Sequence, residues 1–438
     1  MTNQMIQNPF ASGEGHDDCS CAEGRRAQGL TRRGFLGRVG AVGAAGAVAS
    51  MVGPGTAMQL AFAADYVGDT VVVLSLRGGF DGLSAVIPVG DPNYAKLRPT
   101  IGVPASRTKP LDTMFGLHPA LAPLLPLYSA GSLAFVQAVG QAARTRSHFA
   151  AMEEMENAAP GSTLRTGWID RMIGVTGSPS TFSAVHVGSG GAPKSMLGPN
   201  PELVLSDLAS FKLSSPSGTE EQAKWASTLK ALHANAPDTV KGPALATVAA
   251  SAAAAQIAAS YPTPTTAVYP DTPLAKSLKE VARLVKAKAG LRAATIDVGN
   301  WDMHSGLGAS DKGWMFDQLT ALSKALVAFV ADLGDKLSDV TLVTLSEFGR
   351  RAAENGSGGL DHGHGNACLV LGGGVAGGKV YGRWPGLGAD QLDEGDLAGT
   401  TDYRTILAEI LEKRGKLSSA EIFPQLGTER LGMLKQRV

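Results

Sequence analysis

Carboxylate and imidazole side chains gather at the ends of four apolar runs in this chain. Runs 70–76, 293–298 and 340–346 are each followed by acidic or histidine residues, and a fourth run, 367–371, is preceded by them. In an open parallel sheet, functional side chains collect just beyond the carboxyl ends of the strands. Mixed carboxylate and imidazole sets bind divalent metal ions. The pattern predicts a metal site built from distant segments, with these candidate ligands: Asp81, Asp302, His304, Glu347, His362 and His364.

Two pairs among these candidates have a spacing that suits a shared ion. Asp302 and His304 are two residues apart, and so are His362 and His364. In extended backbone, side chains with this spacing point to the same side. The neighbouring Asp361 is a candidate partner that fixes one imidazole tautomer, as metal-bound histidines usually require. The alternatives are a solvated turn for the first pair and a polar, glycine-rich surface loop for the second.

Glu347 and Asp81 each have a second interpretation. Glu347 ends an apolar run, and a buried carboxylate needs a cation or several donors to stay charged. A metal ion would serve, and so would an ion pair with Arg350. Asp81 follows two glycines at the end of the first run, where an aspartate also commonly bonds its own backbone in a turn.

Three residues are candidates for the catalytic chemistry itself. Ser147 stands at a predicted helix start, where the positive end of the helix dipole favours an attacking alkoxide, although a capping serine has the same signature. His148 would assist the leaving group or simply be exposed. Arg350, together with Arg77 and Arg146, would clamp a tetrahedral anion or be an ordinary surface cation.

The order of elements that must position these residues indicates an α/β fold. Continuous apolar, β-branched runs are typical of strands covered on both faces, and helical patterns separate them. This alternation predicts a mostly parallel sheet sandwiched between helices. The predicted strands are 70–76, 133–139, 182–187, 293–298, 340–346 and 367–371, and two of the predicted helices are 148–158 and 314–337.

Segment 217–289 differs from the rest because it is rich in Ala, Lys and Glu and carries no chemical cluster. Its pattern predicts three helices, 220–235, 243–260 and 274–289. We expect this segment to be an inserted helical cap that restricts access to the site and sets the choice of substrate.

The N-terminus resembles an export signal. Residues 31–38 match the twin-arginine motif, a glycine- and alanine-rich stretch follows at 39–57, and 61–63 offer a small-x-small cleavage site. We therefore expect a signal peptide at 1–63 and a mature domain at 64–438, exported by the twin-arginine machinery to the periplasm or beyond. The alternative is an uncleaved anchor, but seven glycines between Gly34 and Gly55 make a poor spanning helix, so we expect no stable membrane span after cleavage.

Composition excludes some classes of partner. The 438 residues include 39 Lys+Arg and 39 Asp+Glu, so the chain lacks the basic excess of a nucleic-acid-binding protein. Removal of the signal would leave Cys368 as the single cysteine, so no intramolecular disulfide is expected. It lies in an apolar run and is expected to be a buried small side chain.

Several stretches resemble an uncharacterised family of twin-arginine-exported bacterial proteins related to the alkaline phosphatase and sulfatase superfamily. The matching stretches are 76–83, 146–149, 300–304, 346–350 and 361–366. The resemblance implies a sheet between helices that holds one or two divalent ions (Zn, Mn or Ca), with Ser147 at the position of the nucleophile. It also implies metal positions at Asp81, at Asp302 and His304, at Glu347, and at His362 or His364.

Two departures from the superfamily pattern stand out: Asp302 and His304 are closer together than usual, and Glu347-Phe348 replaces the usual Asp-His. We expect a metal-dependent hydrolase of phosphate or sulfate esters. The alternative is a non-catalytic envelope or secretion protein that keeps the fold. A metal-independent serine hydrolase is disfavoured because no Gly-x-Ser-x-Gly surrounds Ser147.

Overall fold

The structure of this protein, a computed structural model, describes residues 66–177, 179–213, 219–260 and 267–437. The predicted signal peptide at 1–63 lies outside the described residues, as does the start of the predicted helical insert at 217.

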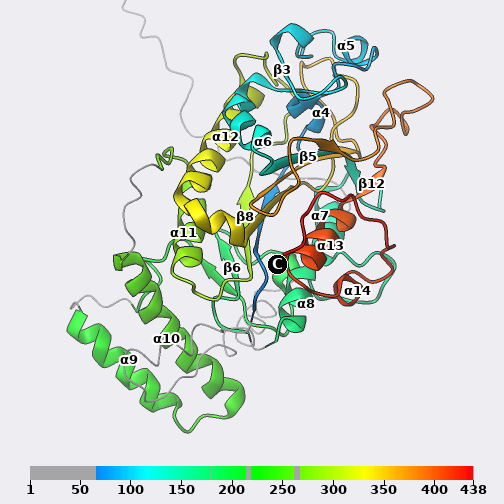
Figure 1. The fold of residues 1–438 in the computed structure, drawn as a ribbon. Coiled ribbons are helices and arrows are strands. Elements are labelled where there is room, and N and C mark those ends of the chain that lie inside the picture. The colour runs from blue at the N-terminus through cyan, green and yellow to red at the C-terminus, as the bar shows by residue number, and fades with distance from the viewer. Residues whose placement is uncertain (1–65, 178, 214–218, 261–266, 438) are drawn as a thin grey trace, which may run out of the picture. The chain divides into compact units, whose positions relative to one another are not determined.

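The centre of the fold is a mixed sheet in which almost every pairing is parallel (Figure 1). The strand order is β11-β5-β10-β9-β1-β8-β6-β7, and β12 pairs with β5. Only β10 runs against its neighbours β5 and β9 among the described strands of this sheet. The strands are β1 (Thr70–Leu76), β5 (Leu133–Gly140), β6 (Ala184–Val187), β7 (Leu203–Leu205), β8 (Ala293–Val298), β9 (Val340–Leu345), β10 (Asn366–Gly372), β11 (Val380–Tyr381) and β12 (Thr401–Asp402).

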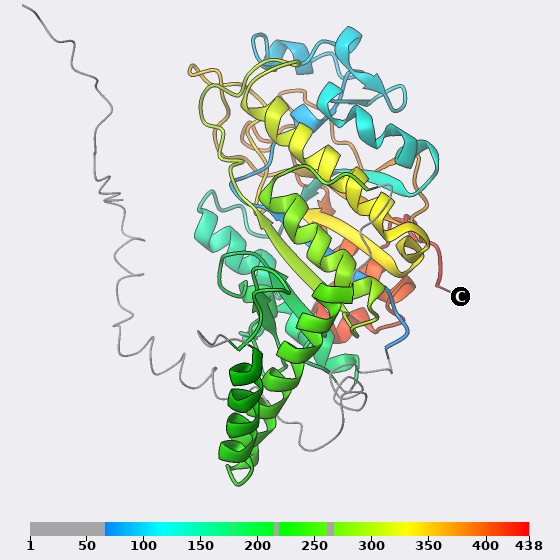
Figure 2. The ribbon, with the colours of Figure 1, turned by 90° about the vertical axis from the view of Figure 1, so that its left-hand side faces the viewer.

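Helices cover both faces of this sheet, as Figures 1 and 2 show. One face carries α11 (Pro273–Lys286) and α12 (Trp314–Leu333); the other carries α7 (His148–Asn157), α8 (Trp168–Val175), α13 (Tyr403–Lys413) and α14 (Ser419–Ile422). Strand β1 serves both cores because successive side chains point to opposite faces. Val72 and Leu74 belong to the first core, and Val71 and Val73 belong to the second.

Short elements connect these layers. A small antiparallel sheet has the order β2-β4-β3, with β2 (Val86–Ile87), β3 (Lys109–Pro110) and β4 (Gly116–Leu117). The remaining helices are α4 (Gly82–Ala85), α5 (Tyr94–Leu97), η1 (Ala105–Arg107), η2 (Pro119–Leu124), α6 (Leu125–Ser129), η3 (Lys194–Met196), α9 (Thr219–His233), α10 (Asp238–Ser260) and η4 (Gly334–Asp339).

The predicted α/β class is confirmed, and the predicted strands agree with the observed ones to within two residues at each end. The helix predicted at 314–337 is too long, because α12 ends at Leu333 and Gly334 takes a left-handed φ of 52° before the chain tightens into η4. Glycine adopts this conformation without steric cost, which is why it commonly ends helices. Cys368 is buried on β10, and burial raises the pKa of its thiol to about 12.

The helical insert is smaller than predicted and does not cover the expected site. Helix α11 is part of the core, since Leu278 and Val281 are fully buried in it. Only α9 and α10 are additions to the layered fold, and α10 packs against both α9 and α11. Figures 1 and 2 both show α9 and α10 at the end opposite α4, which follows the carboxyl end of β1. The prediction that this segment caps the site is therefore wrong.

Helix α10 is also the one described helix that is long and apolar enough to cross a membrane by length and composition. This is weak evidence, because core helices of soluble proteins pass the same test. Ala250, Ala254 and Ile257 of α10 lie in the first core, and this burial explains the apolar composition of the helix.

Candidate metal centre

The sheet topology brings five segments together at one edge, the one formed by the carboxyl ends of the parallel strands. Strands β9, β1 and β8 are parallel neighbours, so the loops after them open at the same edge. Strand β5 also points this way, because β10 is antiparallel to both β5 and β9. The loop before β10 reaches the same edge for the same reason. This edge is where the candidate residues were predicted to meet.

Three imidazoles and one carboxylate converge there. The Nε2 atoms of His304 and His362 lie 2.9 Å apart, and each lies close to Asp302 Oδ1, at 3.1 and 3.2 Å. His148 Nε2 lies 3.6 Å from the other carboxylate oxygen, Asp302 Oδ2. One ligand atom from each of His148, Asp302 and His362 falls within 4.8 Å of the others, a spacing that suits a shared metal ion.

The other nitrogen of each imidazole, Nδ1, is held by an acceptor behind the ring. The Nδ1 pairs are His148 with Glu347 Oε1 at 2.8 Å, His304 with Asp361 Oδ1 at 3.3 Å, and His362 with the Arg146 carbonyl at 2.8 Å. An acceptor at Nδ1 favours a proton there, and in the neutral imidazole this leaves the Nε2 lone pair for a cation. All three Nε2 atoms face the Asp302 carboxylate, to which each imidazole could also donate when it carries both protons.

Glu347 is a positioning residue behind His148. It is buried and also accepts hydrogen bonds from the Gly78 N–H at 2.9 Å and the Ser346 hydroxyl at 3.2 Å. Burial alone would raise its pKa, but the bonds from His148 and Gly78 hold the pKa of Glu347 below its ordinary value. The hydrogen bond to Glu347 in turn raises the pKa of His148. Glu347 was predicted as a direct ligand and His148 as a catalytic group. In the structure, His148 directs its Nε2 toward Asp302, and Glu347 lies behind it at Nδ1.

Arg350 is buried and holds the loops of the site in place. Its buried guanidinium donates to Asp302 Oδ1 at 2.5 Å, to the Gly79 carbonyl at 2.6 Å and to the Leu360 carbonyl at 2.9 Å. Against the effect of burial, Arg350 keeps the pKa of Asp302 below its ordinary value, so this carboxylate stays charged. Arg350 was predicted to clamp an anion. Its guanidinium instead donates to Asp302 and to loop carbonyls of the protein itself.

Two predicted ligands do not join the cluster. Both carboxylate oxygens of Asp81 bond the buried Arg98, at 2.5 and 2.9 Å, and one of them also caps α4 through Ser84 N–H at 3.1 Å. His364 is buried, and its Nε2 lies 3.0 Å from the Gln141 carbonyl. The capping aspartate was the alternative considered for Asp81. We leave both residues out of the candidate set of ligands.

Ser147 is the N-cap of α7, with its hydroxyl accepting from Ala150 N–H at 3.5 Å. It is therefore next to His148 in the chain and at the start of a helix, as predicted. Of the other two arginines, Arg77 pairs with Glu156 at 2.5 Å, and the half-exposed Arg146 pairs with Asp396 at 2.8 Å.

Sequence reasoning missed two residues that shape the centre. The buried ring of Phe348 packs against His148 and His362, with ring centroids 4.9 and 4.7 Å away. Asn355 donates to Asp361 Oδ1 at 3.0 Å and so fixes the acceptor of His304. Phe348 lies beside Glu347 in a motif that had been noticed, whereas nothing in the local sequence around Asn355 signals its role.

The family "Protein of unknown function (DUF1501)" matches residues 69–429, which is most of the chain. The chain belongs to the DUF1501 family. This agrees with the uncharacterised family that the motifs predicted. No curated protein matches the chain.

Solved structures resemble this DUF1501 chain only weakly. Ps i-CgsB has 10% sequence identity and a TM-score of 0.34, with 82% of this chain and 74% of that chain covered. LtaP, a lipoteichoic acid synthase from Listeria monocytogenes, has 12% identity and a TM-score of 0.33, with 80% of each chain covered. PsFucS1, a sulfatase from Pseudoalteromonas sp., has 12% identity and a TM-score of 0.34, with 87% and 77% covered. Such low TM-scores carry no argument, and the fold assignment rests on the sheet order and helix layers.

The donor set of this DUF1501 protein fits a borderline divalent ion. Three imidazole nitrogens and one carboxylate suit Zn²⁺ or Mn²⁺, whereas Ca²⁺ takes six to eight oxygen ligands. Among the described residues, one group of ligand atoms lies within mutual reach, that of His148, Asp302 and His362, and His304 lies beside Asp302 and His362. Glu347 and Asp81, which a second ion would have used, are bonded elsewhere.

Proposed function

We propose that this protein binds one divalent metal ion through His148, Asp302, His304 and His362 and hydrolyses phosphate or sulfate esters. The observation that carries the proposal is the convergence of three Nε2 atoms on one carboxylate while an acceptor holds each Nδ1. An acceptor behind each imidazole is the arrangement that metal-bound histidines usually have.

Exposure of the centre supports a catalytic use of the ion. The side chains of Asp302 and His304 are 46% and 45% exposed, so one side of the cluster faces solvent. A structural metal site is closed by protein ligands, whereas a catalytic one keeps a position open. When bound, a divalent ion supplies Lewis acidity that withdraws charge from the oxygens of an ester.

The chain's own groups supply the remaining parts of the reaction. Ser147 places a hydroxyl at the first turn of α7, whose dipole favours an anionic oxygen. Glu347 and Arg350 keep His148 and Asp302 in position. The scissile ester would lie on the exposed side of Asp302, whose Oδ2 is 3.6 Å from Nε2 of His148, the first residue of α7.

Turnover by the purified protein tests the proposal. Protein loaded with Zn²⁺ or Mn²⁺ is expected to hydrolyse an aryl phosphate or an aryl sulfate, and Ser147→Ala should remove most of this activity while the bound metal stays. The double variant Asp302→Ala, His304→Ala should lose both metal and activity. Asp271→Ala, a change at an exposed residue of the turn before α11, serves as the control. Loaded protein with no turnover of either ester would overturn the proposal.

A second candidate is a non-catalytic envelope protein that uses the ion to join its loops. The buried position of Arg350 favours it, because the guanidinium that was predicted to hold the substrate is occupied by loop carbonyls. Under this proposal the ion binds with the same stoichiometry, and metal removal changes stability without any catalysed reaction to lose.

We also propose that the chain is exported to the periplasm or beyond by the twin-arginine machinery. The motif at 31–38 supports this proposal. Replacement of both arginines, Arg32→Lys with Arg33→Lys, should leave the protein in the cytoplasm of a host with a working pathway. Export of the double variant at the normal rate would contradict it.

A further inference from the structure

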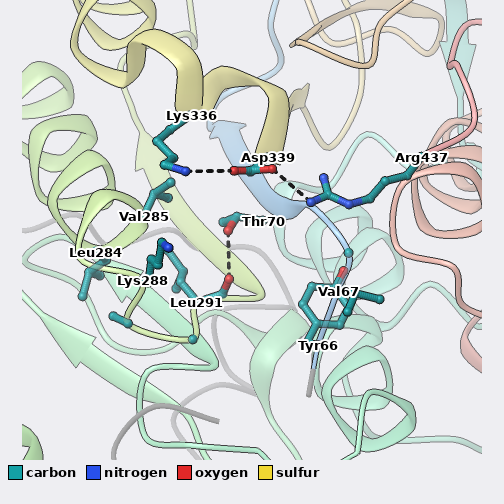
Figure 3. Close-up of a pocket in the computed structure, with 13 residues that line it drawn as sticks. Tyr66, Val67, Thr70, Leu284, Val285, Lys288, Leu291, Lys336, Asp339 and Arg437 are labelled. Atoms are coloured by element: carbon teal, nitrogen blue, oxygen red, sulfur yellow. Dashed lines mark hydrogen bonds and ion pairs between the residues drawn. The ribbon is translucent and has the colours of Figure 1, made fainter. Parts of the chain in front are cut away.

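A second cavity lies at the opposite edge of the sheet from the metal centre (Figure 3). Its volume is about 420 Å³, and its walls include Thr70, which begins β1, and Leu291, which precedes β8. The metal centre follows the other end of β1. Because β1 spans seven residues and a strand rises about 3.3 Å per residue, the two places are separated by roughly 20 Å. We call this space the basal cavity.

One wall of the basal cavity is apolar. It consists of side chains from the last turn of α11 and from the segments that enter β1 and β8: Val67, Leu284, Val285 and Leu291. Val67 is 62% exposed, whereas Leu284, Val285 and Leu291 are buried in the first core, so the open apolar surface is mainly that of Val67, with the edge of Val285. Apolar surface that remains exposed beside a cavity gains free energy when a ligand covers it.

The facing wall carries more positive than negative charge. Lys336 and Arg437 lie on either side of Asp339, at 3.7 and 3.0 Å from its carboxylate oxygens, and Figure 3 shows Lys288 across from them. Lys288 has no carboxylate partner among the residues that the structure describes. The lining therefore has three cations and one carboxylate, a formal charge of +2.

Arg437 is held in place from behind by a carboxylate that already has another partner. Asp69 is fully buried and receives two hydrogen bonds from Arg414, at 2.9 and 3.0 Å. Asp69 also pairs with Arg437. Because Arg414 balances Asp69, this contact orients Arg437 without cancelling the positive charge of the cavity. A cation fixed before binding loses less entropy when an anion arrives.

The backbone at Lys288 is in a conformation that a lysine rarely adopts. Its φ is 53°, at the turn that ends α11, where glycine would carry no steric cost. A non-glycine residue in a left-handed conformation marks a candidate functional position. Its side chain lines the basal cavity, so the strained backbone delivers an unpaired ammonium group to it.

We propose that the basal cavity binds a small organic anion: a carboxylate or phosphate group held by Lys288, Lys336 and Arg437, with an apolar body against Val67 and Val285. The competing interpretation is that the lysines only complement the negative ends of α11 and η4, as cations commonly do. That role would not explain the exposed apolar surface or the fixed position of Arg437.

Calorimetric titration of the full chain with octyl phosphate tests the proposal. We expect one saturable site, with inorganic phosphate bound about tenfold more weakly, a difference that needs burial of only roughly 60 Å² of alkyl surface. Neutral octyl glucoside should not bind. Equal affinities for octyl phosphate and inorganic phosphate, or a titration that does not saturate, would overturn the proposal.

Variants separate a ligand site from a structural role of the lysine. Lys288→Gly should weaken octyl phosphate binding about tenfold, yet raise the thermal midpoint, because glycine relieves the left-handed backbone. Lys276→Ala, at an exposed lysine in the first turn of the same helix, should change neither quantity. Unchanged affinity in Lys288→Gly would contradict the assignment of this site.

The metal centre is the other place where a phosphate group could bind. The titration is therefore repeated with Asp302→Ala, His304→Ala, which removes two proposed ligands of the ion. Binding of octyl phosphate should persist in this variant with the same affinity. Loss of binding there would place the ligand at the metal centre and overturn the basal site, while leaving the proposed function intact.

Discussion

The two nitrogens of each imidazole in the metal centre make different contacts. Nε2 faces the shared space beside Asp302, and Nδ1 faces an acceptor from another loop. The acceptor at His148, Glu347, is buried, whereas the acceptor at His304, Asp361, has a side chain that is 57% exposed. A charged acceptor strengthens the bond of its imidazole to a metal, and it does so most where water does not compete.

Replacement of Glu347 by glutamine is therefore expected to weaken metal binding about 10- to 100-fold, because the amide keeps the shape of the carboxylate but loses its charge. The dissociation constant would be measured by competition with a chromophoric chelator. Asp361→Asn should have a smaller effect because its side chain is more exposed. Asp311→Asn, at an exposed pair with Arg107, is the control and should leave the constant unchanged. Equal constants in wild type and Glu347→Gln would show that this carboxylate does not act on the ion.

Asp81 has a stabilising role of a different kind. Asp81→Ala would leave the fully buried Arg98 without its carboxylate, and loss of one partner of a buried ion pair costs about 3–5 kcal/mol of unfolding free energy. Urea denaturation measures this cost. The double variant Asp81→Leu, Arg98→Met removes both charges and should recover most of it. Metal stoichiometry should be unchanged in every folded variant, and loss of the ion in the double variant would return Asp81 to the ligand set.

At the scale of elements, the strands were easier to predict than the loops between them. Every residue of β1 and β9 is buried, and such continuous apolar runs appear directly in the sequence. The reversed direction of β10 is not visible locally, because a run buried on both faces looks alike in either direction. The predicted extent of the helical insert was wrong for a related reason. Helix α11 has a strongly amphipathic pattern, but this pattern does not show which core the helix packs against.

The distances along the chain explain the result for the site. Asp302 and His304 are two residues apart, as are His362 and His364, and spacing alone predicted each pair; only His362 of the second pair lies in the centre. The bond between His148 and Glu347 joins residues 199 positions apart, and that between Arg350 and Gly79 joins residues 271 apart. Residue type showed that these groups needed partners. The choice between ligand and positioning residue depends on which atoms face each other, and that is set by packing.

The segment that enters the edge strand β7 contains a titratable group with an unusual environment. Glu202 is partly buried, and its Oε2 has no hydrogen-bond partner among the described residues. Burial, with a further contribution from Asp170, raises the pKa of Glu202 to about 7. In the unfolded chain the carboxyl ionises near its ordinary value, so between these two values the unfolded state binds fewer protons than the native state. Stability should therefore fall as the pH rises through this window.

Glu202→Gln removes this titration and should gain stability relative to wild type as the pH rises from about 4.5 to about 7, with no further gain above. Urea denaturation at pH 5 and pH 8 measures the difference between the two proteins, in which the titration of the histidines cancels. Asp207→Asn, at a partly exposed residue that caps a turn after β7, provides the comparison and should show no such pH-dependent gain. A constant difference between Glu202→Gln and wild type at both pH values would mean that this carboxyl ionises normally in the native state.

For the molecule as a whole, the parallel sheet separates two places with different chemistry. The carboxyl ends of β1, β8 and β9 carry an acceptor-rich centre, and the opposite edge carries a cavity of net positive charge. Both are assembled from segments far apart in the sequence, so both depend on the same rigid core. We expect the two places to bind their ligands independently.

Metal binding should stabilise the whole fold, because the four proposed ligands come from three segments: His148 begins α7, Asp302 and His304 follow β8, and His362 precedes β10. An ion that binds only the native state at a free concentration 100 times its dissociation constant adds about 2.7 kcal/mol. Thermal unfolding after chelation and after addition of Zn²⁺, Mn²⁺ or Ca²⁺ should therefore give a higher midpoint with the first two ions than with the third. In the double variant Asp302→Ala, His304→Ala the midpoint should no longer depend on Zn²⁺. If the variant kept the full shift, the ion would bind elsewhere, because a cation cannot keep its affinity after losing two of four ligands.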